Sequence, residues 1–274
     1  MLEIAKSIAA EAAQLLREGQ REAFTYESKS TDADLVTEYD RRAEALIFGR
    51  LRSEFPDHGI VGEEGSSFVG SSSEGYRWYI DPLDGTNNYA HRIPHFAVSL
   101  GLFRGESPEP VLAVVHDPMR DEVYWAQKGE GAYRNGQRLQ VSSSPVIGQS
   151  ILASGFPYDR QTDPVDNIEQ TGLFLKRCRG FRRFGAAALD LAMVAAGSLD
   201  GFWEFKLASW DIAAGVLLVT EAGGTVTRID GSALGHPTEK NHIVASNGLL
   251  HQEMLDLLAP TLTERHLVTG AKVG

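Results

Sequence analysis

Residues 78–88 read Trp-Tyr-Ile-Asp-Pro-Leu-Asp-Gly-Thr-Asn-Asn. The apolar start predicts a strand that ends at Asp81, because Pro82 has no N–H and should stop strand pairing there. Asp81 and Asp84 would then lie together on a tight turn. A short helix that begins at the following Gly-Thr pair would direct its free N–H groups into the same pocket, ready to hold a phosphate. The stretch therefore indicates either a site for a hard divalent cation and a phosphate, or an Asp-Gly turn with solvated acids.

Further segments supply acids that fit such a site. Glu63 and Glu64 stand at the end of another apolar run. Asp211 stands where a helix is expected to begin, a position at which Asp is also a favoured N-cap. Thr37 and Asp40 form a plausible capping pair for a helix at residues 38–54. Taken singly, each of these segments fits a structural role better than a ligand role.

The spacing of apolar residues predicts helices and strands whose order changes half-way along the chain. In the first half we expect helices at 2–17 and 38–54, a Gly- and Ser-rich loop at 65–75, strands at 59–62, 77–80, 97–103, 111–116 and 122–126, and a hairpin turn at 135–136. In the second half we expect strands at 151–154, 200–205, 225–229 and 242–246, and helices at 164–178, 186–196, 211–222 and 248–258. This order predicts an α+β first half (1–145) and an α/β second half (146–274) within one compact unit.

Composition narrows the class of protein. The 274 residues suit one large domain or two small ones. Lys and Arg number 26 against 37 Asp and Glu, and this net charge of −11 argues against broad nucleic-acid binding. An anionic substrate would then need a metal ion to cancel the local charge.

The sequence also predicts a cytoplasmic protein. No apolar run approaches the roughly 18 residues of a membrane span, and the acidic first helix does not fit a signal peptide. The single cysteine, Cys178, excludes an internal disulfide, which suits a reducing compartment.

Taken together, the segments resemble the inositol monophosphatase superfamily. Its two signatures are matched by residues 81–88 and by Trp210-Asp211-Ile212-Ala213-Ala214-Gly215. Other elements are matched by Gly62-Glu63-Glu64, by Lys29…Asp34-Leu35-Val36-Thr37…Asp40, and by the segments 183–190 and 200–204. The matches follow in order over residues 29–224. The resemblance implies an α+β/α/β fold, a layered αβαβα sandwich of the sugar phosphatase type.

The resemblance also implies a set of metal ligands. Glu63, Asp81 and the carbonyl oxygen of Leu83 would hold one Mg²⁺. Asp81, Asp84 and Asp211 would hold a second, and a weaker third ion would lie near Glu63. Two to three Mg²⁺ ions per active site are therefore expected, and their charge would relieve the repulsion among the acids.

The implied reaction is direct hydrolysis of a phosphate ester by a metal-activated water. Thr86 and Asp40 would orient this water and help to deprotonate it, and Glu63 would assist through the metal shell. Backbone N–H groups of Gly85 and Thr86 would hold the phosphate.

The alcohol part of the substrate would meet Gly185, Ala187 and Glu204. A carboxylate such as Glu204 is suited to accept hydrogen bonds from sugar or cyclitol hydroxyls. The chain departs from the family pattern at Ala186, where relatives usually carry Ser or Thr, so one hydroxyl beside the substrate pocket is lost.

The function that the resemblance implies is a Mg²⁺-dependent phosphomonoester hydrolase, with inositol 1-phosphate as expected substrate and Li⁺ as expected inhibitor. The alternatives within this chemistry are the fructose-1,6-bisphosphatase, histidinol-phosphatase, NADP phosphatase and 3′-nucleotidase types. A different alternative is a regulatory role that binds protein or RNA alongside catalysis. It is suggested only by the basic run 176–183, which also fits a solvated face or a subunit contact. The expected partners are a small phosphate ester and a second copy of the chain in a homodimer.

Overall fold

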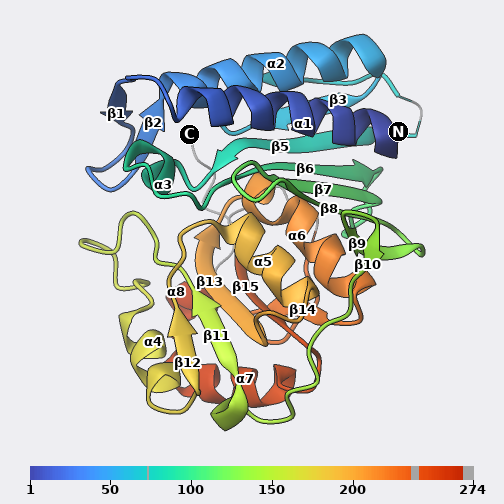
Figure 1. Cartoon of the computed structure of the whole chain (residues 1–274). Coiled ribbons are helices and arrows are strands. Elements are labelled where there is room, and N and C mark those ends of the chain that lie inside the picture. Colours follow the sequence, from blue (N-terminus) through green and yellow to red (C-terminus); the bar gives the residue numbers. More distant parts are fainter. Residues whose placement is uncertain (73, 236–240, 268–274) are drawn as a thin grey trace.

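The computed structural model of the chain describes residues 1–72, 74–235 and 241–267. Its elements stack in five layers, helix–sheet–helix–sheet–helix, which follow one another from top to bottom in Figure 1. The predicted layered αβαβα sandwich is confirmed.

The outer helical layer consists of α1 (Leu2–Gly19) and α2 (Glu38–Glu54). Apolar residues recur at helical spacing on both helices, so each helix has one face to bury. Ile8 and Leu16 of α1 and Ile47 of α2 are fully buried in a core shared with the sheet below. Thr37 and Asp40 form a capping box at the start of α2, as predicted, which brings the Asp40 carboxylate to the end of the helix nearest the sheet edge.

The upper sheet has eight strands in the order β10-β9-β8-β7-β6-β5-β3-β4. Their bounds are β3 (Gly59–Gly62), β4 (Ser67–Phe68), β5 (Tyr76–Asp84), β6 (Ala97–Arg104), β7 (Leu112–Asp117), β8 (Glu122–Gln127), β9 (Gly131–Arg134) and β10 (Gln137–Arg138). A separate hairpin, β1 (Tyr26–Ser28) and β2 (Leu35–Thr37), precedes α2, and the short helix α3 (Thr86–Ala90) follows β5.

The middle layer consists of α5 (Ala187–Ala195) and α6 (Ser209–Glu221), which lie between the two sheets. Small residues allow α6 to lie very close to the upper sheet. A Cβ placed on Gly101 of β6 would stand 2.5 Å from the Cβ of Ala213, far inside van der Waals contact. The core on this side combines residues from both halves of the chain, such as Val115 and Leu218.

The lower sheet has five strands in the order β12-β11-β13-β15-β14. Their bounds are β11 (Ile151–Ser154), β12 (Gly180–Arg182), β13 (Gly201–Leu207), β14 (Thr225–Arg228) and β15 (Asn241–Ser246). The outermost layer holds α4 (Ile168–Leu175), α7 (His251–Leu258) and the single turn α8 (Glu264–Leu267), with 3₁₀ turns at Ile147–Gln149 and Ala259–Thr261. The last strand of the upper sheet ends at Arg138, and the first strand of the lower sheet begins at Ile151. The division into two subdomains near residue 145 stays a prediction.

Several predicted boundaries were wrong, and for two of them the reason is local. The helix expected at 164–178 is only α4, because the side chains of Asp163 and Asp166 accept hydrogen bonds from Val165 N–H and Ile168 N–H and favour turns before it. The strand expected to stop at Pro82 continues to Asp84. Within the described part of the chain, no helix has both the length and the hydrophobicity that crossing a membrane requires.

Candidate active site

A β-bulge brings two of the predicted ligands to the same face of the sheet. Asp81 of β5 pairs with Ser99 of β6, but Asp84 pairs with Ala97, so the intervening stretch of β5 is one residue longer than that of β6. Side chains alternate between faces along a strand, so residues three apart would normally point to opposite sides. The extra residue in β5 shifts this alternation by one position, so Asp81 and Asp84 lie on the same face of the sheet. The N–H of Leu83 donates to Asp81 Oδ1 at 2.9 Å, so the Asp81 side chain replaces a strand hydrogen bond at the kink.

Four acids from separate elements surround this bulge. Asp81 and Asp84 come from β5, Glu63 follows β3, and Asp211 lies in the first turn of α6. Burial raises the pKa of Asp81 well above its ordinary value, and the charges of the other three acids raise it further. Burial likewise raises the pKa of Glu63 to about 7, with Lys29 acting against this rise. The predicted metal ligands therefore form one mutually repelling acidic cluster, in which Asp81 and Asp84 are buried and Glu63 and Asp211 are half-buried.

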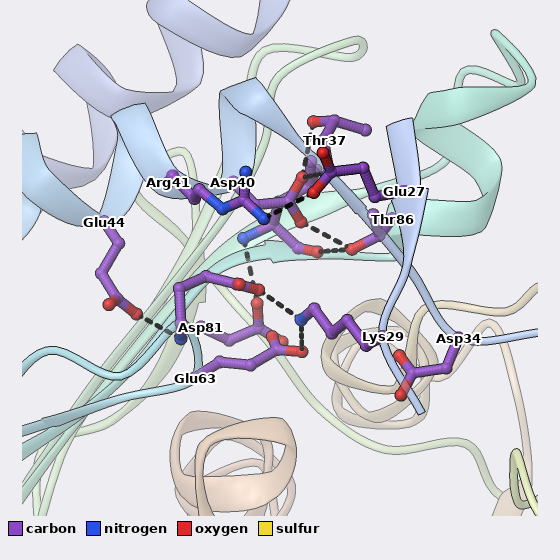
Figure 2. Close-up of polar contacts among 12 residues, drawn as sticks. Glu27, Lys29, Asp34, Thr37, Asp40, Arg41, Glu44, Glu63, Asp81 and Thr86 are labelled. Carbon is purple, nitrogen blue, oxygen red and sulfur yellow. Dashed lines mark hydrogen bonds and ion pairs between the residues drawn. The ribbon is translucent and has the colours of Figure 1, made fainter. Parts of the chain in front are cut away.

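Each acid of the cluster also has a hydrogen-bond partner within the protein. Asp84 accepts from the N–H groups of Ala187 and Ala188 at 3.1 and 2.8 Å. A side chain of strand β5 therefore caps the start of helix α5. Asp211 accepts from the N–H of Ala208 at 2.7 Å. Figure 2 shows Lys29 pointing from the end of β1 toward Glu63, with Nζ 3.1 Å from Oε1.

The donor chemistry of this cluster fits a hard divalent cation. All the side-chain atoms that could bind a metal here are carboxylate oxygens. The backbone carbonyl oxygen of Leu83, in the bulge, is a further candidate metal ligand. Each carboxylate has lone pairs beyond those that its protein partners use. Among residues 1–72, 74–235 and 241–267, no three His, Cys, Asp or Glu side chains already converge on a point as metal ligands do. In this arrangement Glu63 bonds to Lys29, and Asp84 bonds to the backbone of α5.

A second network joins the capping box of α2 to α3. Thr86 Oγ1 lies 2.8 Å from Asp40 Oδ1 and 3.1 Å from the carbonyl oxygen of Leu83, so its single proton is shared between two acceptors. Asp40 Oδ2 accepts from the N–H of Thr37 at 2.8 Å and from its hydroxyl at 2.5 Å. Burial raises the pKa of Asp40, and these donors limit the rise. Figure 2 shows Thr86 and Asp40 meeting above the acidic cluster, so the predicted catalytic pair is in contact.

The residues predicted to meet the alcohol part of the substrate come from β13 and from the start of α5. Gly185 has a φ of +83°, and Ala187 is the first residue of α5. A Cβ placed on Gly155 would stand 2.2 Å from the carboxyl atoms of Glu204, so Glu204 lies directly against that glycine. Burial raises the pKa of Glu204 to about 8, while Arg183 acts against the rise. Ala186 is the N-cap residue of α5 and has no side-chain cap, so Asp84 supplies it instead.

Residues 1–267 match the inositol monophosphatase family. The chain belongs to the inositol monophosphatase family.

Named relatives of this family carry two kinds of title. A protein of Pseudomonas aeruginosa named Nus factor SuhB is 45% identical over 269 residues, which cover 96% of this chain and 97% of the relative. An inositol-1-monophosphatase of Synechocystis sp. is 42% identical over 235 residues, which cover 86% of this chain and 80% of the relative. The solved structure of an inositol monophosphatase from Anabaena (Nostoc) sp. superposes with a TM-score of 0.83 at 38% identity, covering 94% of this chain and 95% of that one.

Sequence reasoning missed one residue that shapes the acidic site of this family member. Glu44 of α2 is buried, and its two carboxylate oxygens accept from the N–H groups of Glu64 and Ser66 at 2.7 and 2.8 Å. A Cβ on Gly62 would stand 2.4 Å from the Glu44 carboxylate, so Glu44 fixes the turn that presents Glu63. A signal was present, because Glu44 shares the apolar face of its helix with Ile47 and Leu51, where a charge is rare without a partner.

Two further charged residues lie near the site, Arg183 of the basic run 176–183 and Asp190. Arg183 is exposed, and its charge opposes the raised pKa values of Glu204 and Asp84. Asp190 is buried in α5, and its Oδ1 has no hydrogen-bond partner among the described residues. A surface cavity of about 740 Å³ lies elsewhere, beside α4 and α8, and contains none of the predicted site residues.

Proposed function

We propose that the chain hydrolyses phosphate monoesters in the presence of Mg²⁺, with inositol 1-phosphate as the substrate that fits best. The observation that carries this proposal is the acidic cluster of Glu63, Asp81, Asp84 and Asp211 next to the hydrogen-bonded pair Thr86 and Asp40. Membership of the inositol monophosphatase family supports the reaction class, and the relative named inositol-1-monophosphatase supports the substrate.

Mg²⁺ would be held by the four acids of the cluster and by the carbonyl oxygen of Leu83. When bound, it would supply positive charge for the phosphate and lower the pKa of a coordinated water. Lys29 would release Glu63 for this purpose and keep its ion pair with Glu64. The predicted number of ions, two to three, stays a prediction.

Proton transfer would run through Thr86 and Asp40. The Thr86 hydroxyl donates toward Asp40, which leaves its oxygen lone pairs to accept a hydrogen bond from the attacking water. The raised pKa of Asp40 suits a group that takes up a proton during the reaction. The N–H groups of Gly85 and Thr86, at the start of α3, would hold the phosphate oxygens, and Glu204 would accept hydrogen bonds from the hydroxyls of the leaving alcohol.

The decisive experiment measures phosphate release from a panel of phosphomonoesters with Mg²⁺ and with excess chelator. Asp211→Asn should lower kcat by roughly 100-fold or more, the scale of losing one electrostatic catalytic group. Asp256→Asn is the matched control, because Asp256 is exposed on α7 and should leave kcat unchanged. Full activity in chelator would overturn the proposal, and the order of the panel would separate inositol 1-phosphate from the other sugar-phosphate substrates.

A second candidate function is favoured by one specific feature. The run 176–183 places Lys176, Arg177, Arg179, Arg182 and Arg183 in exposed positions beside β12, the edge strand of the lower sheet. Together with the relative named Nus factor SuhB, this basic edge supports a partner-binding role alongside catalysis. A variant with Arg177→Glu and Arg179→Glu should weaken binding of labelled RNA yet release phosphate normally, and Asp211→Asn should do the reverse. The predicted homodimer would be tested by sedimentation of the same variants.

A further inference from the structure

Glu204 lies where the pairing of β13 becomes irregular on both sides. Toward β11, the last paired position joins Trp203 to Ser154, so Gly155 and Glu204 are the residues that follow. Toward β15, the register shifts immediately after Glu204. Regular strand pairing therefore stops at Glu204, and other contacts must hold this part of β13 against the end of β11.

Packing rather than hydrogen bonding positions the Glu204 side chain. Among the described residues, none donates a hydrogen bond to its carboxylate, so the lone pairs of both oxygens remain free. A Cβ on Gly155 would stand 2.2 Å from each of the three carboxyl atoms of Glu204. Carbon atoms in contact normally stand about 3.5–4 Å apart, so the carboxylate occupies the space that any side chain at position 155 would need.

Glycine at position 155 is required by this space and not by the backbone. The φ of Gly155 is not positive, so its conformation would suit any residue. The missing side chain is therefore what allows the carboxylate of Glu204 to lie against the end of β11.

Asn167 holds the backbone on both sides of this contact. Its side-chain amide donates to the carbonyl oxygen of Gly155 at 2.6 Å and to Ser154 Oγ at 2.7 Å. Its Oδ1 accepts from Trp203 Nε1 at 2.7 Å, and Ser154 Oγ donates to the carbonyl oxygen of Trp203 at 2.5 Å. We call these four bonds the asparagine network. The side chains of all three residues that form it are buried, and a buried network in which each group has a partner specifies one arrangement of the strand ends.

The place of Asn167 in the chain shows that its side chain is committed to the strands. Asn167 is the N-cap residue of α4, where an Asn side chain ordinarily accepts from an N–H of the first helical turn. Here it makes no such cap. Its φ of +69° is left-handed, a conformation that Asn adopts more readily than most residues. The side chain thus forgoes the helix cap and bonds to the residues beside Glu204.

We propose that Gly155 and Asn167 are positioning residues for Glu204 and that they determine how strongly hydroxylated alcohols are preferred. Gly155 leaves room for the carboxylate, and the asparagine network holds that room in place. This inference rests on the proposed phosphomonoesterase function, in which Glu204 accepts hydrogen bonds from the hydroxyls of the leaving alcohol. Because both residues act on Glu204, they should affect recognition of the alcohol and not cleavage of the phosphate.

The first test adds one methyl group beside Glu204. Gly155→Ala should fold, because the group that the methyl meets is the end of a flexible side chain, which can move aside. The displaced carboxylate should lose its bond to a substrate hydroxyl, so kcat/KM for inositol 1-phosphate should fall roughly 10- to 150-fold, mainly through KM. For an aryl phosphate without hydroxyls, kcat/KM should change less than twofold. Gly172→Ala is the matched control, because a Cβ on Gly172 of α4 would meet none of the described neighbours within 4 Å.

The second test removes the asparagine network. Asn167→Gly suits the positive φ, so the variant should fold, and it should raise KM for inositol 1-phosphate while the aryl phosphate is cleaved as before. Asn167→Asp keeps an acceptor for Trp203 but loses both donated bonds, and it should raise KM as well. Asn135→Gly is the matched control, because Asn135 also has a positive φ and also bonds to the backbone, in a hairpin of the upper sheet.

Double-mutant cycles show whether both residues act through Glu204. In a Glu204→Ala background, Gly155→Ala and Asn167→Gly should not lower kcat/KM for inositol 1-phosphate further, whereas a purely structural defect would lower it in both backgrounds. Thermal unfolding supplies a readout that does not depend on activity. The change in Tm caused by Gly155→Ala should be more favourable in the Glu204→Ala background, where the methyl group has space. Equal changes in Tm in both backgrounds would refute the contact.

The outcomes separate this inference from the function on which it rests. If the wild type cleaves phosphate esters but Gly155→Ala and Asn167→Gly keep its preference for inositol 1-phosphate over the aryl phosphate, only this inference is overturned. If the wild type cleaves none, the proposed function fails, and the role of Gly155 and Asn167 in substrate preference fails with it.

Discussion

At the scale of single residues, the hydroxyl of Thr86 connects the β-bulge to the start of α2. It links the carbonyl oxygen of Leu83, in the bulge, to Asp40, in the first turn of α2. Asp40 would remain bonded to Thr37 without it, so a substitution of Thr86 should affect chemistry more than folding.

Thr86→Val should therefore lower kcat by about 10²–10⁴-fold, the usual contribution of a positioned proton-transfer group, with a smaller change in KM. Steady-state phosphate release measures both parameters. Thr220→Val is the control, because the Thr220 hydroxyl only donates to carbonyl oxygens one turn earlier in α6. A loss of less than tenfold in Thr86→Val would remove the hydroxyl from the proposed mechanism.

Part of this residue network could be predicted from the sequence. The Thr37-x-x-Asp40 spacing predicts a capping box, and the capping box is present. The contact between Asp40 and Thr86 joins residues 46 positions apart and depends on how α2 packs over β5, which local patterns do not specify. Only the family resemblance paired these two residues, and their catalytic roles stay predictions.

At the scale of elements, the start of α5 is unusual because its cap comes from a strand. Ala186 has no side-chain oxygen, and Asp84 accepts from the N–H groups of Ala187 and Ala188 instead. A new hydroxyl at 186 would therefore find these donors already occupied. A Cβ placed on Gly85 would stand 3.2 Å from the Cβ of Ala186, so residue 186 lies close to Gly85.

Ala186→Ser should consequently change Tm by less than about 1 °C, although an ordinary N-cap substitution contributes about 1 kcal/mol, or roughly 2–4 °C in a chain of this size. It should shift the relative rates on different polyol phosphates while the Mg²⁺ requirement stays the same. Thermal unfolding without metal measures the first effect. A rise in Tm of the ordinary size would mean that Asp84 does not cap α5.

Element types were predictable where apolar periodicity runs for several turns or strands, as in α1, α2 and the strands of the upper sheet. Boundaries were less predictable where polar side chains compete with the backbone, as before α4. The short strands β1, β2 and β12 carry too few residues for a periodic signal. β1 and β2 pair with each other in a hairpin, and β12 pairs with β11, from which α4 separates it in the chain. The turn at Asn135-Gly136 was predicted correctly, because both residues have the positive φ that this hairpin type requires.

At the scale of the whole molecule, the acids with raised pKa values make stability depend on pH. A carboxyl group whose folded pKa is raised binds more protons in the folded state, so its stabilising effect is present at low pH and is lost as pH rises. Glu63 and Glu204, with pKa values of about 7 and about 8, lose their protons between pH 6.5 and 8.5. Buried histidines such as His95 and His242 have lowered pKa values and oppose this trend up to about pH 7.5, because a histidine of the unfolded chain loses its proton around pH 6.5.

The metal-free protein should therefore lose roughly 0.5–1 kcal/mol between pH 7.5 and 8.5, which lowers Tm by about 1–4 °C. Thermal unfolding in chelator at several pH values measures this slope. Mg²⁺ should flatten it, because the cation stabilises the ionised acids, and Glu204→Gln should flatten it in part without metal. A Tm that rises with pH over this range would contradict the raised pKa values.

The bulge in β5 has a consequence for how the chain can vary over evolutionary time. Between Asp81 and Asp84, the number of residues determines on which side of the sheet each acid lies, whatever residues occupy the two positions between them. A substitution at Leu83 keeps its backbone carbonyl and both carboxylates in place. A deletion of one residue would restore the regular alternation and turn one acid toward α1 and α2. We therefore expect insertions and deletions in this short segment to be tolerated less than substitutions, because the number of residues between the two acids must stay constant.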